Sequence, residues 1–267
     1  MGGGSECVEV DGETVAFERH GERPPLLLLH GAVSDSRDWR RELERLSDEF
    51  TVVAWDAPGC GRSFDPPDDF GLHGYADCLA GFVDALGIER PHVMGLSFGS
   101  GLALELFRRH RGLPRSLVLT AAYAGWRGSL GPAVAEERRR IGLGAADQPR
   151  EEYIRELNET MFADSVPADV AEEMTAIAMD FHPAGLRAMS NAFADADLRD
   201  VLPEIDVPTL LVHGDRDRRS PLRVAEDLHE RIPGSRLVVI AGAGHVVNLE
   251  APERFQEEVR SFLRVAG

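Results

Sequence analysis

The sequence contains no lysine, so all 29 of its basic residues are arginine. Without lysine the chain cannot form a Schiff base with a substrate, and it cannot build the phosphate-binding loop that depends on a lysine. Acidic residues outnumber basic residues, 46 to 29, and the formal net charge is -17. A surface with this charge repels phosphate backbones and anionic membranes, which argues against nucleic acid as a partner.

Cysteine and long apolar stretches are also scarce. The three cysteines stand at positions 7, 60 and 78, an odd number without the C-x-x-C spacing of zinc or redox sites. The first residues lack the basic and apolar segments of a signal peptide. The longest aliphatic run, Leu26 to Leu29, is far too short to span a bilayer. We therefore expect a cytoplasmic protein with no disulfides, no metal and no membrane partner.

Short apolar runs alternate with amphipathic segments along most of the chain. Apolar residues recur at helical spacing after several of these runs, for example from Tyr75 to Leu86 and from Ser97 to His110. Strands that alternate with helices predict a mostly parallel sheet covered on both faces. The strand-like runs are Val8 to Val10, Thr14 to Phe17, Leu26 to Leu29, Thr51 to Trp55, His92 to Met94, Ser116 to Thr120, Thr209 to Val212 and Leu237 to Ile240.

The alternation stops in the segment 121–206, which shows helical patterns and no clear strand. Helices there cannot connect strands that are missing, so we expect them to pack over one edge of the sheet as a cap. The predicted organisation is a core formed by 1–120 and 207–267 and a helical insert formed by 121–206. The helix-like patches are Ala133 to Arg140, Arg150 to Met161, Ala168 to Met179 and Gly185 to Phe193.

Three residues predict nucleophilic catalysis. Ser97 is the centre of Gly95-Leu96-Ser97-Phe98-Gly99, a G-x-S-x-G motif between a strand and a helix, where a strained turn exposes a nucleophilic serine. A serine hydroxyl needs a base, and the base needs an acid that orients it. His245 and Asp217 follow the last two strands, at the carboxyl edge where open α/β sheets place their sites. Asp215 is the alternative acid.

Five motifs together resemble those of the α/β-hydrolase superfamily, in particular its capped esterases and cofactor-free perhydrolases. The resemblance implies an eight-stranded α/β-hydrolase fold with a cap. It also implies an oxyanion hole formed by the N–H groups of Phe98 and Ala32, with Val33 as the alternative to Ala32. His30, Asp56 and Arg62 then shape loops rather than react. The motifs are His30-Gly31, Asp56 to Ser63, Gly95 to Gly99, Gly214 to Asp217 and Gly244-His245.

The activity implied is hydrolysis of a carboxylic ester or lactone of a small hydrophobic substrate through an acyl-enzyme, without metal or organic cofactor. Alternatives on the same triad are a slow small-molecule receptor, a perhydrolase, or a biosynthetic methyl esterase, cyclase or carbon–carbon hydrolase. Members that cleave carbon–carbon bonds usually carry a Gly-Pro-Gly loop, from which Ser34-Asp35 departs. Nothing indicates an oligomeric state. Candidate substrate-binding residues, which could equally pack the cap onto the core, are Tyr123, Trp126, Phe162 and Val246.

Overall fold

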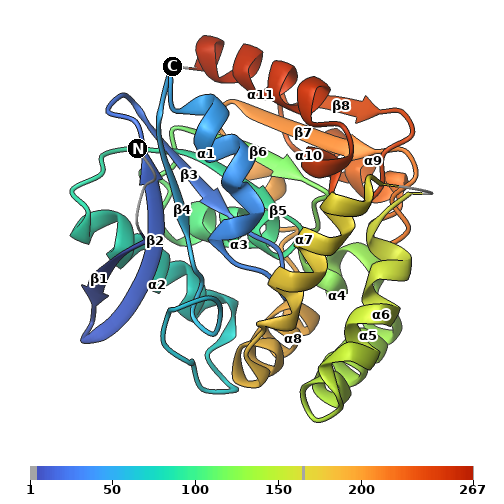
Figure 1. The fold of residues 1–267 in the computed structure, drawn as a ribbon. Coiled ribbons are helices and arrows are strands. Elements are labelled where there is room, and N and C mark those ends of the chain that lie inside the picture. The colour runs from blue at the N-terminus through green and yellow to red at the C-terminus, as the bar shows by residue number, and fades with distance from the viewer. Residues whose placement is uncertain (1–4, 164–165, 267) are drawn as a thin grey trace.

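A computed structural model describes residues 5–163 and 166–266. Its strands are β1 (Glu6–Val10), β2 (Glu13–His20), β3 (Pro25–Leu29), β4 (Thr51–Trp55), β5 (His92–Leu96), β6 (Ser116–Thr120), β7 (Thr209–Gly214) and β8 (Arg236–Ile240). They form one sheet in the order β1-β2-β4-β3-β5-β6-β7-β8 (Figure 1). β2 runs antiparallel to β1 and β4, and the other neighbours pair in parallel. The predicted eight-stranded, mostly parallel sheet is confirmed.

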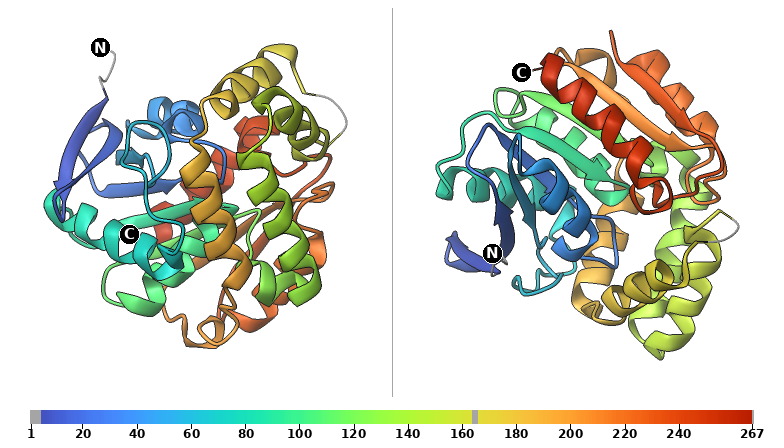
Figure 2. Two further views of the ribbon diagram at one scale, coloured as in Figure 1. Left: turned by 90° about the horizontal axis from the view of Figure 1, so that it is seen from below. Right: turned by 45° about the horizontal axis from the view of Figure 1, so that its top comes forward.

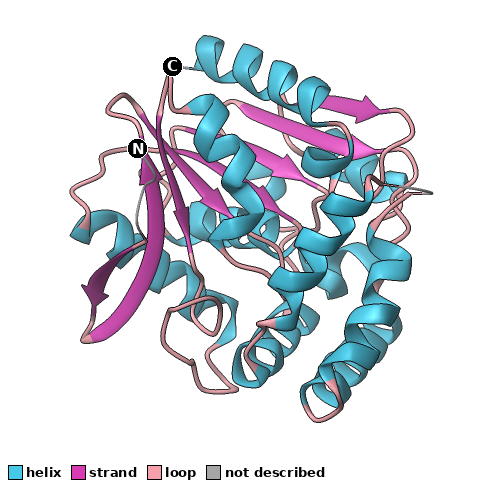
Figure 3. Ribbon diagram, viewed as in Figure 1, coloured by secondary structure: helices cyan, strands magenta, loops and turns pink. Residues whose placement is uncertain are grey.

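Helices cover both faces of this sheet (Figure 3). The apolar strands contribute side chains to the core on both faces of the sheet. In β3, Leu27 and Leu29 pack in one core cluster, and Leu26 and Leu28 pack in another. Strands buried on both faces read as continuous apolar runs. The first cluster lies under α2 (Gly71–Ala85), α3 (Phe98–Arg109) and α9 (Leu222–Arg231), and the second under α1 (Arg40–Leu46) and α11 (Pro252–Ala266).

The segment between β6 and β7 folds into helices that gather at the end of the sheet toward which the parallel strands point (Figure 1). In both views of Figure 2, α5 lies alongside α8. A Cβ atom at Gly142 in α5 would overlap with the Ser190 hydroxyl of α8, so glycine permits this close approach. The helices are α4 (Gly125–Leu130), α5 (Pro132–Ala146), α6 (Arg150–Met161), α7 (Ala168–Met179) and α8 (Pro183–Asp195).

Four of these helices coincide with the four helical patches of the sequence, and α4 is additional. Short helical segments also occur at η1 (Ser36–Trp39), η2 (Leu202–Glu204) and α10 (Val247–Glu250). Within the ranges 5–163 and 166–266, no helix combines the length and apolar character needed to cross a membrane.

Candidate active site

Ser97 occupies the turn between β5 and α3 with a backbone φ of 53° and ψ of -108°. A residue other than glycine in such a conformation carries about 1–3 kcal/mol of strain, which the surrounding structure must hold. Two glycines make the turn possible. A Cβ atom at Gly95 would overlap with the carbonyl oxygen of Gly99, and a Cβ at Gly99 would overlap with that of Leu29. The motif glycines are therefore required by the close passage of three chain segments.

The loop after β3 lies directly beside the nucleophile. A Cβ atom at Gly31 would lie 3.7 Å from the Cβ of Ser97. Val33 has a φ of 62°, an unusual value for a β-branched residue, so this loop is also held under strain. Phe98 is the first residue of α3, where helix N–H groups have no carbonyl one turn earlier to bond. The two segments expected to supply the oxyanion hole, at Ala32 and Phe98, thus both adjoin Ser97.

The imidazole of His30 fixes this loop through two hydrogen bonds. Its Nε2 accepts the backbone N–H of Ala57 over 3.0 Å, so Nδ1 carries the proton and donates to the carbonyl of Gly31 over 2.7 Å. Burial lowers the pKa of His30, which favours this neutral form. Asp56 accepts the N–H groups of Ser36 and Arg62 over 2.9 and 3.1 Å. Both side chains thus have loop-fixing contacts.

The His245 ring is hydrogen-bonded to Asp217. Its Nδ1 lies 2.8 Å from Asp217 Oδ2, and both side chains are buried. The other oxygen of Asp217 accepts the backbone N–H groups of Arg219 and Ser220, each over 2.8 Å. Asp215, by contrast, is exposed and accepts the N–H of Gly242 over 2.7 Å. The structure therefore brings Asp217 rather than Asp215 to the histidine.

The pKa of Asp217 reflects this environment. Burial alone would raise the pKa, but the charge and hydrogen bond of His245 and the N–H of Ser220 outweigh burial and lower the pKa below its ordinary value. Asp217 is therefore an ionised acceptor at neutral pH. Because His245 donates through Nδ1, its Nε2 is free to act as a base.

The loop that carries His245 is bound to the end of a cap helix. The N–H of His245 donates to the carbonyl of Met161, the last residue of α6, over 3.0 Å. Glu250 bridges the same two segments, because its two oxygens accept the N–H groups of Gly244 and Ala163, each over 2.9 Å. The position of α6 and the position of the histidine are thus coupled through backbone contacts.

A cavity of about 320 Å³ is lined both by loops that follow the strands and by the helices between β6 and β7, and Ser97 and His245 both line it. Tyr123 and Trp126, two of the predicted substrate-binding residues, also line it. The other two are not among the described lining residues. Val246 is fully buried in the core cluster with Leu96 and Val212, and Phe162 packs against that cluster.

Two residues of α6, Tyr153 and Leu157, also line the cavity but were not among the predicted substrate-binding residues. Tyr153 and Leu157 line the cavity together with Met161, because their spacing of four residues places them on one stripe of α6. This spacing was visible in the sequence and could have identified them. Arg138 of α5 and Arg219 after β7 also line the cavity, and no sequence motif marks them.

The ionisable side chains of the cavity include two acids, Asp38 and Glu156, among the described residues. Asp38 is buried, and burial raises its pKa to about 7. Within residues 5–163 and 166–266, no three His, Cys, Asp or Glu side chains are grouped in a way that could hold a metal ion. The groups that adjoin the cavity include a serine, a hydrogen-bonded histidine–aspartate pair and the N–H groups at the start of α3.

Known proteins are similar to this chain in sequence and in fold. The sequence model described as "Alpha/beta hydrolase family" matches residues 26–258, most of the chain. The chain belongs to the alpha/beta hydrolase family. Within this family, the pimeloyl-[acyl-carrier protein] methyl ester esterase of Neisseria meningitidis serogroup B is 32% identical over 246 residues, which cover 88% of this chain and 91% of the relative.

Two further proteins are similar to this chain over most of their length. The 2-hydroxymuconate semialdehyde hydrolase of Pseudomonas putida is 33% identical over 259 residues, or 92% of this chain and 89% of that protein. The structure of a thermophilic esterase from Thermogutta terrifontis superposes with a TM-score of 0.91 at 30% identity and covers 98% of this chain and 99% of its own. By name, all three are esterases or hydrolases.

Proposed function

We propose that this alpha/beta hydrolase cleaves carboxylic esters or lactones of small, partly apolar substrates through an acyl-enzyme on Ser97. The observation that carries the proposal is the strained backbone of Ser97 at the elbow, in a cavity that it shares with the hydrogen-bonded pair His245–Asp217. Strain of this kind persists where it serves to expose a reacting group. The proposal includes a cytoplasmic location and a small-molecule partner.

The reaction begins when the Ser97 hydroxyl attacks the ester carbonyl while His245 Nε2 takes its proton. The carbon–oxygen bond to the alcohol then breaks, and the imidazolium returns the proton to the leaving alcohol. Water attacks the resulting acyl-enzyme with His245 as base, and the acid leaves as Ser97 is restored. Asp217, ionised and held by two backbone N–H groups, keeps the imidazole in the reactive tautomer throughout.

The negative charge that develops on the carbonyl oxygen needs hydrogen-bond donors that are already in place. We assign the N–H groups of Phe98 and Ala32 to this task, since one begins α3 and the other follows Gly31 beside Ser97. An oxyanion-hole donor of this kind typically contributes about 3 kcal/mol to transition-state stabilisation. The start of α3 adds the favourable end of a helix dipole.

The test is hydrolysis of short-chain p-nitrophenyl esters by the wild type and by Ser97→Ala. We expect kcat to fall by about a million-fold, to the level left by the rest of the site. Ser47→Ala is a matched control, because Ser47 bonds the carbonyl of Glu44 on the surface and does not line the cavity. Equal rates for wild type and Ser97→Ala, or no labelling of Ser97 by a fluorophosphonate, would refute the proposal.

One relative favours a second candidate, carbon–carbon bond hydrolysis on the same residues. The Pseudomonas putida protein is named for a semialdehyde rather than for an ester. Against this candidate, Ser34-Asp35 departs from the Gly-Pro-Gly loop expected of such members. Turnover of 2-hydroxymuconate semialdehyde at a higher kcat/KM than any p-nitrophenyl ester would favour the second candidate over the first.

A further inference from the structure

Two arginine side chains of the cavity lie close to the proposed catalytic residues. The guanidinium of Arg138 lies 5.6 Å from the ring centroids of both Tyr123 and Trp126, so it sits over two aromatic faces of the cavity wall. It donates to the Tyr123 hydroxyl over 3.1 Å and to the carbonyl of Arg219 over 2.7 Å. The Tyr123 ring is in turn 6.4 Å, centroid to centroid, from the ring of His245. One aromatic side chain therefore contacts both the cation and the proposed base.

Arg219 adds a second cation to the same wall. Its guanidinium donates to the Thr160 hydroxyl over 2.9 Å, and its backbone N–H holds Asp217. Neither Arg138 nor Arg219 has an ion-pair partner among the described residues, and both line the cavity. Arg139, the next residue of α5, forms ion pairs with Glu136 and Asp195. Unlike Arg139, the two cavity arginines therefore have no acidic partner among the described residues, although acidic residues outnumber basic residues 46 to 29 in this chain.

The hydrogen bonds already present leave most of the guanidinium donors available. A guanidinium carries five N–H donors, of which two are used by Arg138 and one by Arg219. Cations in a partly enclosed, largely apolar cavity are stabilised strongly by a counter-charge. Glu156 and Asp38 line the same cavity, but neither forms an ion pair with these arginines within the described ranges.

We infer that Arg138 and Arg219 bind an ionised carboxylate on the substrate, so that the preferred substrates are esters that carry a second, anionic carboxyl group. This inference rests on the proposed function and specifies its substrate class. The flat fork of a guanidinium matches a carboxylate with two parallel hydrogen bonds, and its stacking on Tyr123 and Trp126 holds the Arg138 fork in a defined plane. The apolar remainder of the substrate would contact Leu157, Met189 and Phe193.

The test compares charged esters with neutral isosteres, with the carboxylate on either side of the ester bond. On the acyl side the pair is mono-p-nitrophenyl glutarate and p-nitrophenyl glutaramate. On the alcohol side it is para-acetoxybenzoate and para-acetoxybenzamide. In at least one pair, Arg138→Met and Arg219→Met should each lower the ratio of kcat/KM for the anionic ester to kcat/KM for the neutral ester about 10-fold to 100-fold, mainly through the KM of the anionic ester.

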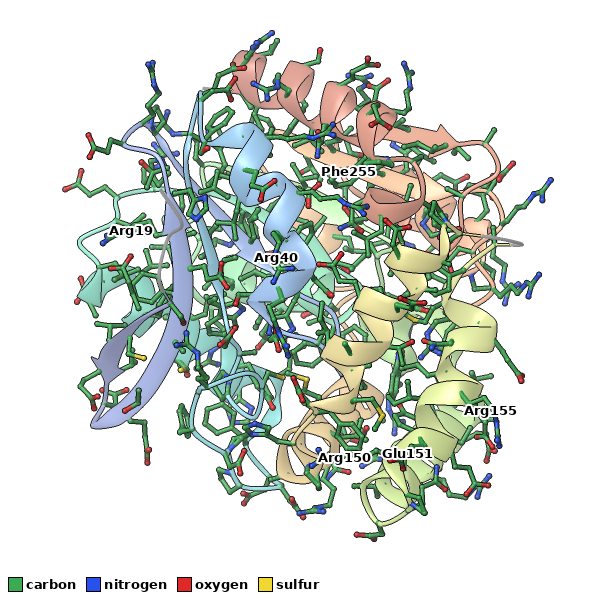
Figure 4. The ribbon with its side chains drawn as sticks, viewed as in Figure 1. Arg19, Arg40, Arg150, Glu151, Arg155 and Phe255 are labelled. Carbon is green, nitrogen blue, oxygen red and sulfur yellow. The ribbon has the colours of Figure 1, made fainter. Side chains whose placement is uncertain are left out.

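Arg155→Met is the matched control, because Arg155 of α6, labelled in Figure 4, is exposed and is not among the described residues that line the cavity. It should leave the ratio of anionic to neutral rates at the wild-type value in both pairs. The inference is overturned if Arg138→Met and Arg219→Met also leave that ratio unchanged. Thermal unfolding identifies a variant that fails to fold. If Arg138→Met is unstable because it loses its hydrogen bonds to Tyr123 and to the carbonyl of Arg219, the result for Arg219→Met decides the test.

A second measurement separates failure of this inference from failure of the proposed function. If the wild type hydrolyses none of the esters, the proposed function fails, and calorimetric titration with disodium glutarate still tests the anion site. Saturable binding that is lost in Arg138→Met supports the site without esterase activity. Absence of binding to the wild type overturns it. If the neutral esters are hydrolysed through Ser97 and glutarate neither binds nor inhibits, only the substrate class proposed here is wrong.

Discussion

Replacing Asp217 with asparagine should almost abolish ester hydrolysis while leaving the fold intact. In the wild type, Asp217 Oδ1 accepts two backbone N–H groups, from Arg219 and Ser220, and Oδ2 accepts His245 Nδ1. Asparagine has one oxygen, which must stay on the side of the two backbone donors. Its NH₂ group then faces His245 and must donate to Nδ1. The proton of the imidazole moves to Nε2, which can no longer accept a proton from Ser97.

The size of the effect follows from this change of tautomer. In a serine protease triad the same substitution lowers kcat by about 10⁴-fold, which corresponds to about 5.5 kcal/mol of activation free energy. We expect a similar loss for Asp217→Asn because all the donors to its carboxylate are fixed backbone or ring N–H groups. The assay is kcat for a p-nitrophenyl ester, alongside the midpoint of thermal unfolding.

Asp215→Asn is the matched control. Asp215 lies in the same turn, is exposed, and accepts a hydrogen bond from Gly242 instead of from the histidine. The asparagine side chain can still accept this bond, so kcat should stay within about threefold of the wild type. If Asp217→Asn retains more than about a tenth of wild-type kcat, or if Asp215→Asn loses as much activity as Asp217→Asn, the assignment of the acid is wrong.

Two further predictions concern stability. Burial raises the pKa of Glu42 from 4.5 to about 7. Between these two pH values the folded protein keeps a proton on Glu42 that the unfolded chain has lost, so the free energy of unfolding falls as pH rises. Relative to Glu42→Gln, the wild type should lose up to about 3 kcal/mol of unfolding free energy between about pH 5 and pH 8, measured with urea. Gly99→Ala should cost about 2 kcal/mol or more and lower Tm by several degrees, because its Cβ would overlap with the carbonyl of Leu29.

Each stability prediction has an outcome that contradicts it. An identical pH dependence of unfolding for the wild type and Glu42→Gln would show that Glu42 is ionised in the fold. For Gly99→Ala the control is Gly144→Ala, since a Cβ at Gly144 in α5 meets no atom within 4 Å. That substitution should stabilise α5 by about 0.5–1 kcal/mol. Equal Tm changes for the two alanine variants would contradict the packing argument.

The regular elements follow from local patterns of the chain. The apolar run Leu26 to Leu29 predicts a strand buried on both faces, and the structure places its alternate residues in two separate core clusters. Asp11 and Gly12 predict a hairpin turn, and both adopt the positive φ that such a turn requires, 52° and 85°. These patterns act over a few residues, so they can be recognised without knowledge of the rest of the fold.

Local patterns failed where an element is short or breaks the usual preferences. Helix α4 was not predicted, because its six residues include Gly125 and Gly128, and glycine is a poor helix former. Tertiary contact compensates, since a Cβ at Gly125 would overlap with Ala196. Phe162 and Val246, predicted as substrate-binding residues, are not among the described residues that line the cavity, for a related reason. Residue type marked them as apolar, but the direction of each side chain depends on how the loops pack.

The sequence by itself determined the family and the mostly parallel sheet, and it predicted the helical insert and the three residues proposed for acyl transfer. It could do so because strand order, turn geometry and a strained serine elbow each impose requirements on neighbouring residues. Only the tertiary structure decided that Asp217 and not Asp215 reaches His245, and that Arg138 and Arg219 face the same cavity. Those relations join positions from separate helices and loops. They depend on how the cap docks on the sheet, which no short stretch of sequence encodes.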